Sequence, residues 1–376
     1  MDREDGCFAV EKELHGSERR KRAMIAMSGG VDSSVAALLM QEAGYDCLGV
    51  TMRLYRAPGF QTRCAKSCCS DEDEDDAAIV CDQLGIEHES LCCTKRFAQT
   101  VIRRFVQEYE AGRTPNPCID CNRYLKFDTL MEHMRGRGFD LLVTGHYVRS
   151  RYSEADGRWQ LMKAADARKD QSYVLYMLTQ EQLSRLCFPL GALRKEEARQ
   201  IAQSRGLTTA KKADSQDICF VPDGDHAAFI ERWSGKRAPE GDIVDLSGRV
   251  LGRHRGLIRY TVGQRRGLNV SLGESAYVVE KNLLDNTLRV GPQEALNRRE
   301  LTASDFHWLS IPEPARAMRC TARTRYHQPE ADAAVFPLPG RRARIIFDEP
   351  QRAVAPGQAV VLYDGELVLG GGTIEA

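Results

Sequence analysis

The stretch MIAMSGGVDSSVAALL, residues 24 to 39, constrains the fold of this chain more than any other. A short apolar run that predicts a buried strand leads into a turn of small and hydroxyl residues, and a helical pattern follows at once. Gly29 and Gly30 can adopt backbone angles that let successive N–H groups face one concavity. Ser33 and Ser34 then open a helix whose N-terminus carries partial positive charge. The sequence therefore predicts an anion-binding loop between a strand and a helix.

The loop lacks the Lys of the common nucleotide-binding pattern GxxxxGK[ST], so a kinase or GTPase of that type is not expected. Strand and helix patterns continue to alternate beyond the loop. Strands are expected at 23–27, 47–54, 86–92 and 139–148, and helices at 34–43, 74–85 and 96–112. Such alternation predicts a parallel sheet with helices on both faces and with ligands at the C-terminal ends of its strands. Ser28, Met52 and Gly145–His146 all fall at such strand ends.

The apolar pattern from about residue 172 to 210 is helical, and this helical pattern ends after Cys219. Short alternating segments take over there, separated by Gly, Pro, Asn and Asp, and residues 276–291 are typical of a β-hairpin. Several short strands are expected in 342–376, as in a small β-barrel or sandwich. We therefore expect an N-terminal extension (1–21), an α/β domain (22–221), a small central domain (222–294) and a C-terminal β domain (295–376).

Charge and hydropathy exclude some classes of protein. No apolar run approaches the roughly 18 residues that a membrane span needs, and the N-terminal segment has the pattern of neither a signal nor a transit peptide. A cytoplasmic location is therefore expected. The 53 basic and 53 acidic residues balance, so net charge says nothing of a partner. The Arg-rich segment 249–266 is a candidate nucleic-acid surface, whereas the acidic run 71–76 is expected to be solvated surface.

Thirteen cysteines are many for a chain of this kind, and in the cytoplasm they are expected to be thiols, metal ligands or catalytic groups. Burial as small apolar side chains is expected for Cys47, Cys81, Cys187 and Cys320. A zinc site would combine Cys118 and Cys121 with a second group from Cys64, Cys68 and Cys69. Catalytic sulfur chemistry would use Cys118, Cys121 and Cys219, with Lys126, Lys211 or Lys212 stabilising a thiolate. The pattern alone leaves zinc and catalysis open.

A resemblance to known proteins bears on this choice. SGGVDSS after a strand resembles the signature of ATP pyrophosphatases, which cleave ATP between the α- and β-phosphates. Together with GRTPNPC-x-x-CN…KFD, TGHY, KDQSYVLYML, DSQDICFV, TVGQRRGL and APGQAVVLYDGE, in that order, it resembles the tRNA-specific 2-thiouridylase family from about residue 22 to the C-terminus. The fold implied is an α/β parallel-sheet ATP-pyrophosphatase domain, a small central domain and a C-terminal β-barrel.

The resemblance also implies roles for individual residues. It makes Cys121 the nucleophile and Cys219 the carrier of a persulfide. The ATP-binding residues that it implies are Ala26, Met27, Ser28, Gly29, Gly30, Val31, Asp32, Ser33, Ser34, Met52 and Gly145. The target base would meet Asn116, Pro117 and Cys118. Contacts with tRNA would come from His146, Lys169, Asp170, Gln171, Arg325, Tyr326 and Gln358, and we expect Arg265 and Arg266 to contact its backbone.

The reaction implied is ATP-dependent 2-thiolation of the wobble uridine of tRNAs for Lys, Glu and Gln, with Mg²⁺ accompanying the ATP. The expected partners are tRNA and a cysteine desulfurase or sulfur-relay protein, and the chain is expected to be a monomer. Many family members have an Asp, assigned as a general base, where this chain has Cys118. Cys118, Cys121 and Cys219 could instead hold a [4Fe–4S] cluster with one open iron. Two rival functions are a small-metabolite ATP-pyrophosphatase synthetase and a non-catalytic, zinc-stabilised RNA-binding module.

Overall fold

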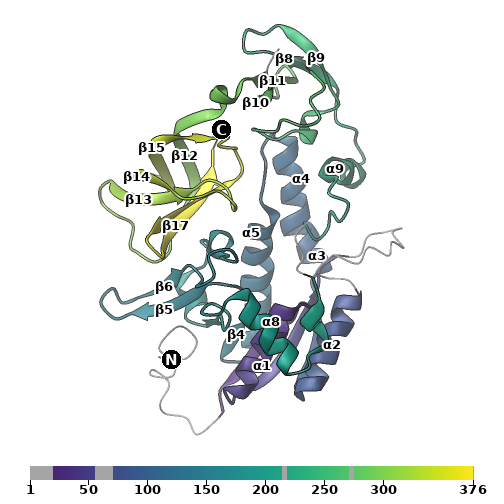
Figure 1. Cartoon of the computed structure of the whole chain (residues 1–376), viewed down its shortest axis with the longest axis vertical. Coiled ribbons are helices and arrows are strands. Elements are labelled where there is room, and N and C mark those ends of the chain that lie inside the picture. The colour runs from purple at the N-terminus through teal and green to yellow at the C-terminus, as the bar shows by residue number, and fades with distance from the viewer. Residues whose placement is uncertain (1–19, 56–70, 214–217, 271–274, 376) are drawn as a thin grey trace.

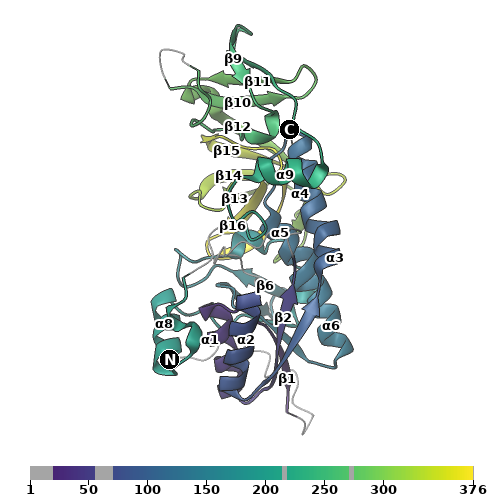
Figure 2. The same cartoon turned by 90° about the vertical axis from the view of Figure 1, so that its right-hand side faces the viewer.

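The computed structural model describes residues 20–55, 71–213, 218–270 and 275–375. Most of the expected N-terminal extension and the group Cys64, Cys68 and Cys69 lie outside these ranges. The chain forms an elongated molecule in which an α/β domain lies at one end, a barrel in the middle and a small four-stranded sheet at the other end (Figures 1 and 2). Within the described ranges, no helix combines the length and apolar character that a membrane span requires.

The α/β domain is built on five parallel strands in the order β3-β2-β1-β4-β7. The strands are β1 (Arg22–Ala26), β2 (Asp46–Arg53), β3 (Glu87–Cys92), β4 (Leu141–Val143) and β7 (Leu186–Cys187). Side chains of the central strand alternate between two cores, because Ala23 and Ile25 pack on one face of the sheet and Met24 on the other. The parallel sheet predicted from the sequence is confirmed.

Helices cover both faces of this sheet. They are α1 (Val31–Glu42), α2 (Asp71–Leu84), α3 (Thr94–Phe97), α4 (Arg103–Glu110), α5 (Pro117–Cys121), α6 (Leu130–Gly136), α7 (Gln180–Leu183) and α8 (Lys195–Ser204). Helices α3 and α4 are joined by the π-helical turn Ala98–Ile102, and a second π-helical segment, Asn122–Thr129, directly follows α5. Wide turns of this kind are frequent beside functional sites.

The helical pattern expected at 172–210 is wrong for its first half. Only the short 3-10 turn Ser172–Val174, α7 and the two-residue strand β7 form before α8. Every side chain from Ser172 to Leu178 is buried. Because the segment is buried on all sides, its apolar pattern did not distinguish a helix from the tight turns that form.

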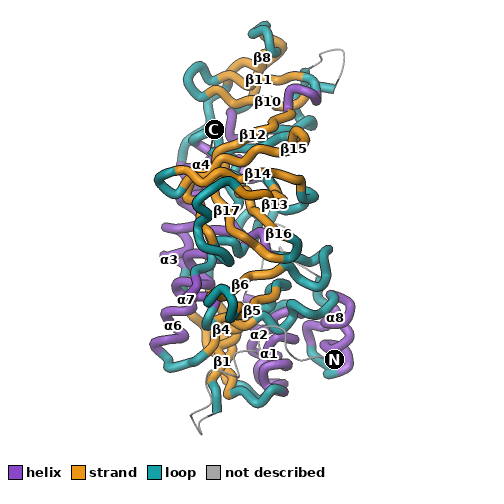
Figure 3. The backbone as a smooth tube through the Cα atoms, turned by 90° about the vertical axis from the view of Figure 1, so that its left-hand side faces the viewer, coloured by secondary structure: helices purple, strands orange, loops and turns teal. Residues whose placement is uncertain are grey.

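A hairpin that was not predicted from the sequence links the α/β domain to the barrel. Strands β5 (Arg149–Ser153) and β6 (Arg158–Met162) pair with each other, and Met162 pairs with Leu367 of the barrel. The hairpin therefore extends the sheet of the barrel to eight strands, whereas the parallel sheet of the α/β domain stays separate (Figure 3).

The C-terminal domain is a closed antiparallel barrel. Its strands are β12 (Asn297–Trp308), β13 (Met318–Arg323), β14 (Ala331–Leu338), β15 (Arg342–Arg352), β16 (Ala359–Asp364) and β17 (Leu367–Ile374). Strand β17 pairs with both β16 and β12, which closes the ring and leaves no free edge between them. Of the two alternatives expected for this region, the barrel is the one that forms.

The central domain consists of α9 (His226–Ser234) and four strands, β8 (Gly241–Val244), β9 (Val250–His254), β10 (Tyr277–Asn282) and β11 (Thr287–Gly291). The predicted hairpin is the antiparallel pair β10–β11. Asn286 turns it with a φ of 52°, a left-handed conformation that Asn tolerates better than most residues. Short 3-10 turns at Thr208–Lys211, Leu257–Arg259 and Gln293–Leu296 complete the fold.

Candidate active site

The loop between β1 and α1 is held in shape by its own side chains. Gly29 has a φ of 66°, and a Cβ at this position would overlap the carbonyl oxygen of Asp73 at the start of α2, so only glycine fits. The hydroxyl groups of Ser33 and Ser34 donate to the carbonyl of Gly30 over 3.1 and 2.9 Å. The loop is thus a preformed turn at the N-terminus of a 12-residue helix, which is the geometry that favours an anion.

The other residues expected to bind ATP gather around this loop. Met52 is on β2 and Gly145 follows β4, and these two strands are the neighbours of β1 in the sheet. A Cβ on Gly145 would lie 2.9 Å from the backbone nitrogen of Ser33, so glycine permits close approach to the loop. The C-terminal ends of three adjacent strands therefore meet at one edge, as parallel-sheet topology requires.

Asp32 has partners that sequence reasoning missed. Lys195, the first residue of α8, places its Nζ 2.7 Å from both carboxylate oxygens of Asp32. The hydroxyl of Tyr147 donates to the Oδ1 atom of Asp32 over 2.8 Å. Tyr147 lies in the TGHY motif, but nothing in the pattern around Lys195 marks it as a partner of a residue so far back in the chain.

The segment before Cys219 is anchored to the loop. The hydroxyl of Thr209 donates to the Ser34 hydroxyl over 2.9 Å, and Lys212 forms ion pairs of 2.6 Å with Asp73 and 2.5 Å with Asp76. The acidic run 71–76 is therefore not merely solvated surface, since Asp73 is buried and holds Lys212. Ser215 and Gln216, in the DSQD motif, lie outside the described residues.

The C-x-x-C motif lies at the start of a helix. The side chain of Asn116 caps α5 by accepting from the backbone N–H of Cys118 over 3.1 Å, and Pro117 is the first helical residue. Cys118 is exposed and Cys121 is half-buried. Residues three apart on a helix share a face, so both thiols point to the same side of α5.

Asp120, between the two cysteines, is a buried carboxyl group. Burial raises its pKa to about 6, although the positive charges of Arg104 and Arg123 oppose the rise. The Nε atom of Arg104, on α4, lies 3.3 Å from an oxygen of Asp120. Asp120 thus has a pKa near neutrality and lies on the helix that carries the two thiols, so it is a candidate proton acceptor or donor that the sequence did not single out.

Cys219 lies near α4 because the residue after it, Phe220, packs against that helix. The ring of Phe220 packs edge-on against Phe105 of α4, with ring centroids 5.2 Å apart, and against Phe97 at 5.6 Å. Arg104 forms an ion pair with Asp120, the residue before Cys121. Phe105 packs against Phe220, the residue after Cys219. Consecutive positions of α4 thus anchor the two cysteine segments, which are 98 positions apart in the chain.

The barrel contacts the approach to the cysteine helix. The backbone N–H of Thr114 donates to the carbonyl of Pro356 over 2.8 Å, and the Gln358 side chain donates to the carbonyl of Thr114 over 2.8 Å. Gly357 allows this fit, since a Cβ there would lie 2.9 Å from the Thr114 nitrogen. The APGQ motif of the barrel and the GRTPNPC motif of the α/β domain are therefore in direct contact.

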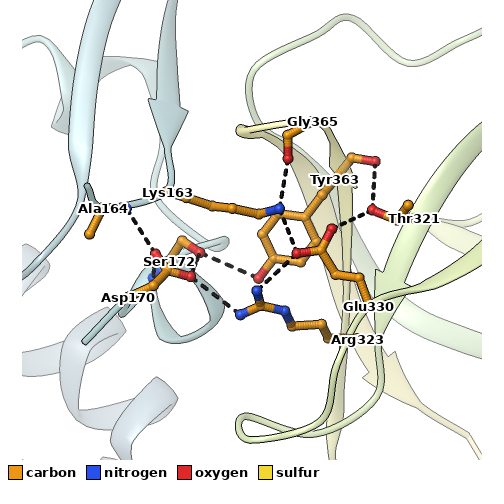
Figure 4. A network of polar contacts seen from close by, with 9 residues as sticks. All are labelled: Lys163, Ala164, Asp170, Ser172, Thr321, Arg323, Glu330, Tyr363 and Gly365. Carbon is orange, nitrogen blue, oxygen red and sulfur yellow. Dashed lines mark hydrogen bonds and ion pairs between the residues drawn. The ribbon is translucent and has the colours of Figure 1, made fainter. Parts of the chain in front are cut away.

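Tyr326 lies within electrostatic range of both Asp170 and Cys118. Burial raises the pKa of Tyr326 to about 12, and the negative charges of Asp170 and Cys118 add to the rise. The carboxylate of Asp170 is itself enclosed: it accepts from Ser172 over 2.8 Å and from Arg323 of the barrel over 3.3 Å. Figure 4 shows this network continuing through Glu330, Lys163 and Tyr363. Asp170 thus joins the α/β domain to the barrel.

Other residues expected to contact tRNA also point into the protein. His146 is buried, its Nδ1 atom lies 2.8 Å from the Thr144 hydroxyl, and burial lowers its pKa so that the ring is neutral. The Gln171 side chain accepts from the backbone N–H of Tyr147 over 2.9 Å. Arg325 donates to the carbonyls of Val262 and Ala353 over 2.8 and 2.9 Å. These side chains fix local structure, and their contact with tRNA stays a prediction.

Three cationic residues of the same expectation are more accessible. Arg265 and Arg266 are exposed in the turn before Leu268, and Lys169 is half-exposed. Accessible cations of this kind suit the phosphate backbone of a nucleic acid, so of the basic residues predicted to bind tRNA these fit best as they stand.

A metal site is the other expectation for the cysteines. Within residues 20–55, 71–213, 218–270 and 275–375, no three His, Cys, Asp or Glu side chains are arranged to hold a metal ion. Whether Cys118, Cys121 and Cys219 act as thiols or hold a [4Fe–4S] cluster stays a prediction, and the second zinc group expected from Cys64, Cys68 and Cys69 lies outside these ranges. Cys47, Cys81, Cys187 and Cys320 are buried, as expected. Burial raises the pKa of Cys47, Cys81 and Cys320 to about 12, which keeps these three as inert thiols.

Comparison with known proteins covers nearly the whole chain. Residues 21–223 match the family model described as the tRNA methyl transferase HUP domain, 227–292 its PRC-barrel domain, and 298–374 an aminomethyltransferase beta-barrel domain. Curated relatives with the name tRNA-specific 2-thiouridylase MnmA include those of Moorella thermoacetica (48% identical, covering 94% of this chain and 99% of the relative) and Symbiobacterium thermophilum (46%, covering 97% and 95%). The relative from Acetivibrio thermocellus is 44% identical, covering 95% and 99%.

Proposed function

Because the chain belongs to the tRNA-specific 2-thiouridylase family, we propose that it replaces the C2 oxygen of the wobble uridine with sulfur, using ATP, in tRNAs for Lys, Glu and Gln. One observation carries the proposal. A short stretch of chain leads from Thr209, which binds the loop at Ser34, to Phe220, which binds α4 beside the cysteine helix. In this proposal the same stretch therefore links the loop that binds ATP to the cysteines that transfer sulfur.

In the first half-reaction the loop binds the phosphates of ATP. The backbone N–H groups at the start of α1 suit a pyrophosphate leaving group. The C2 carbonyl oxygen of uracil attacks the α-phosphorus, and the bond to the β-phosphate breaks with release of pyrophosphate. Oxygen is a poor leaving group from a carbonyl carbon, whereas AMP is a good one, so this step activates C2. Mg²⁺ is expected to accompany the triphosphate.

In the second half-reaction Cys219 carries the sulfur as a persulfide. The terminal sulfur attacks C2 and AMP leaves, so that the base is joined to Cys219 through a disulfide. The thiolate of Cys121 then attacks the Cys219 sulfur, which releases 2-thiouridine and leaves a Cys121–Cys219 disulfide. An external dithiol supplies the two electrons that restore both thiols. The anchoring of both segments on α4 supports this exchange.

The wobble base must leave the anticodon stack to reach the site, as for other enzymes that act on bases. Asn116, Pro117 and Cys118 at the start of α5 receive it in this proposal, with Tyr326 close by. The sulfur comes from a cysteine desulfurase or a relay protein, and the chain works as a monomer in the cytoplasm. A synthetase for a small metabolite would have no use for a barrel that contacts the cysteine motif, so this rival has no support.

The test is a thiolation assay with a tRNA that has an unmodified wobble uridine, ATP and a persulfide donor. We expect pyrophosphate and 2-thiouridine in equal amounts from the wild type. Cys219→Ser should form no 2-thiouridine, and Asp32→Ala should lose adenylation while still binding tRNA. Normal thiolation by Cys219→Ser would contradict the proposal.

A second measurement separates persulfide from cluster chemistry. Iron and acid-labile sulfide are measured on protein purified without oxygen, beside Cys118→Ala. We expect no stoichiometric iron, with thiolation supported by the desulfurase alone. About four irons per chain that are lost in Cys118→Ala would make Cys118 a cluster ligand and would replace the persulfide scheme.

A further inference from the structure

The ion pair between Lys195 and Asp32 is unusual for its burial. Lys195 is 5% exposed, although lysine is among the residues least often buried. Its Nζ lies 2.7 Å from both oxygens of a carboxylate that belongs to the loop and is 163 positions earlier in the chain. Burying an ammonium group is costly unless it is paired and well hydrogen-bonded. A feature that costs stability at a binding loop suggests a role in binding.

Tyr147 is a second partner of the Asp32 carboxylate and lies beside the Lys195 ammonium group. Tyr147 donates its hydroxyl to Asp32 over 2.8 Å, and the Lys195 Nζ lies 5.7 Å from the centre of the Tyr147 ring. Lys195 is itself fixed at its backbone, because its N–H donates to the carboxylate of Asp166 over 3.2 Å. The ammonium group is therefore held against the loop from α8.

Charge explains why the loop needs this cation. Asp32 is the second residue of α1, directly before Ser33 and Ser34. Its negative charge stabilises the helix N-terminus but repels the phosphates that the proposed function places there. The common nucleotide loop carries its own Lys, whereas residues 26–34 contain no basic residue.

We propose that Lys195 is a positioning residue for ATP. It acts by neutralising the charge of Asp32, at the start of α1 beside the phosphate-binding loop. The cation that other nucleotide loops contain comes here from α8, a helix that packs against α1 but follows it much later in the chain. The inference rests on the proposed function, because it concerns the same ATP. It assigns to Lys195 a part in binding rather than in stability alone.

The test measures the affinity of the full chain for an ATP analogue that cannot be cleaved between the α- and β-phosphates, by calorimetry without tRNA. We expect Lys195→Met to bind at least about tenfold more weakly, a loss of about 1.4 kcal/mol, because an unpaired carboxylate then faces the phosphates. The double variant Asp32→Asn/Lys195→Met should bind within about threefold of the wild type, since it again has no net charge at this position. A purely structural lysine predicts no such recovery.

Lys281→Met is the matched control. Lys281 is a half-buried lysine whose Nζ donates to the carbonyl of Tyr260 over 3.0 Å, but it lies on β10 of the central domain, and its loss should leave ATP affinity unchanged. Equal binding by the wild type and Lys195→Met would overturn the inference, and so would a double variant as weak as the single one. Should Lys195→Met not fold, the double variant decides alone, and a tenfold loss there overturns the inference. Failure of the wild type to bind the analogue would overturn the proposed function as well.

Discussion

Replacement of Asp120 by Asn should stabilise the protein near neutral pH. Burial raises the pKa of this carboxyl group from 3.8 to about 6, against the pull of Arg104 and Arg123. The folded state therefore holds the proton more tightly than the unfolded state does. The resulting contribution to stability is fully present below pH 3.8 and is lost as the pH rises through about 6. Above that pH the protein carries a buried charge that asparagine would not have.

The size of the effect follows from the shift. A rise of about two pKa units corresponds to about 3 kcal/mol at 1.36 kcal/mol per unit, which is an upper limit. Arg104 loses a partner at 3.3 Å in the variant, but its side chain is 40% exposed and can turn to water. We therefore expect Asp120→Asn to gain about 1 to 3 kcal/mol at pH 7.5, and a melting temperature higher by about 2 to 6 °C.

Thermal unfolding of wild type and variant at pH 4.5 and 7.5 measures this effect, and the gain should shrink at the lower pH. Asp305→Asn is the matched control, because Asp305 binds the same Arg123 at 2.7 Å and Arg341 at 2.8 Å. Arg123 and Arg341 hold the pKa of Asp305 below its usual value, so the same substitution should destabilise at pH 7.5. A fall in melting temperature for Asp120→Asn at pH 7.5 would refute the reasoning.

Three further outcomes can be measured. Gly29→Ala should cost more stability than Gly44→Ala in thermal unfolding, because both residues have positive φ (66° and 85°) but only Gly29 faces a carbonyl oxygen; equal losses, of about 1 to 2 kcal/mol each for the backbone conformation, would contradict this. Burial lowers the pKa of Lys281 from 10.5 to about 8, so the penalty for its charge is present below pH 8 and vanishes as the pH rises towards 10.5; Lys281→Met should accordingly raise the melting temperature at pH 7 and lose this advantage at pH 10. Gln358→Ala removes the bond from the barrel to Thr114, and it should lower the rate of tRNA thiolation several-fold while the affinity for ATP stays unchanged; an equal loss of both would place its effect elsewhere.

The periodic parts of the fold were predictable from the sequence. Strand β1 and helix α1 have clear periods, and the glycine turn between them has one physical solution. The hairpin at 276–291 was equally readable from its alternation and its Asn-containing turn. Residues 172–178 were not, because a segment buried on all sides shows no face from which a period can be recognised.

The candidate site was predictable where its residues form local motifs. Gly29, Gly145 and the C-x-x-C pair stand in recognisable strings, and the structure gives each of the two glycines a steric reason. Lys195 and Asp120 could not be found in this way. The first is a partner of Asp32 only through the tertiary fold, and the second depends on burial that a sequence does not display.

The inward orientation of Asp170 and Arg325 has the same explanation. Both are charged and were expected from the family resemblance to contact tRNA, so exposure was the natural expectation. Their partners, Arg323 of the barrel for Asp170 and two backbone carbonyls for Arg325, come from distant segments. Charge in a motif thus indicates importance without telling whether the side chain binds a ligand or another domain.

The most direct test of the central claim is a single turnover with Cys219 preloaded as a persulfide, in the presence of tRNA and ATP and in the absence of reductant, followed by mass spectrometry of protein and tRNA. The account predicts one 2-thiouridine per loaded chain and, in the same amount, a disulfide between Cys121 and Cys219 that peptide mapping identifies. Formation of 2-thiouridine with both cysteines still reduced, or undiminished thiolation by Cys121→Ser, would contradict it.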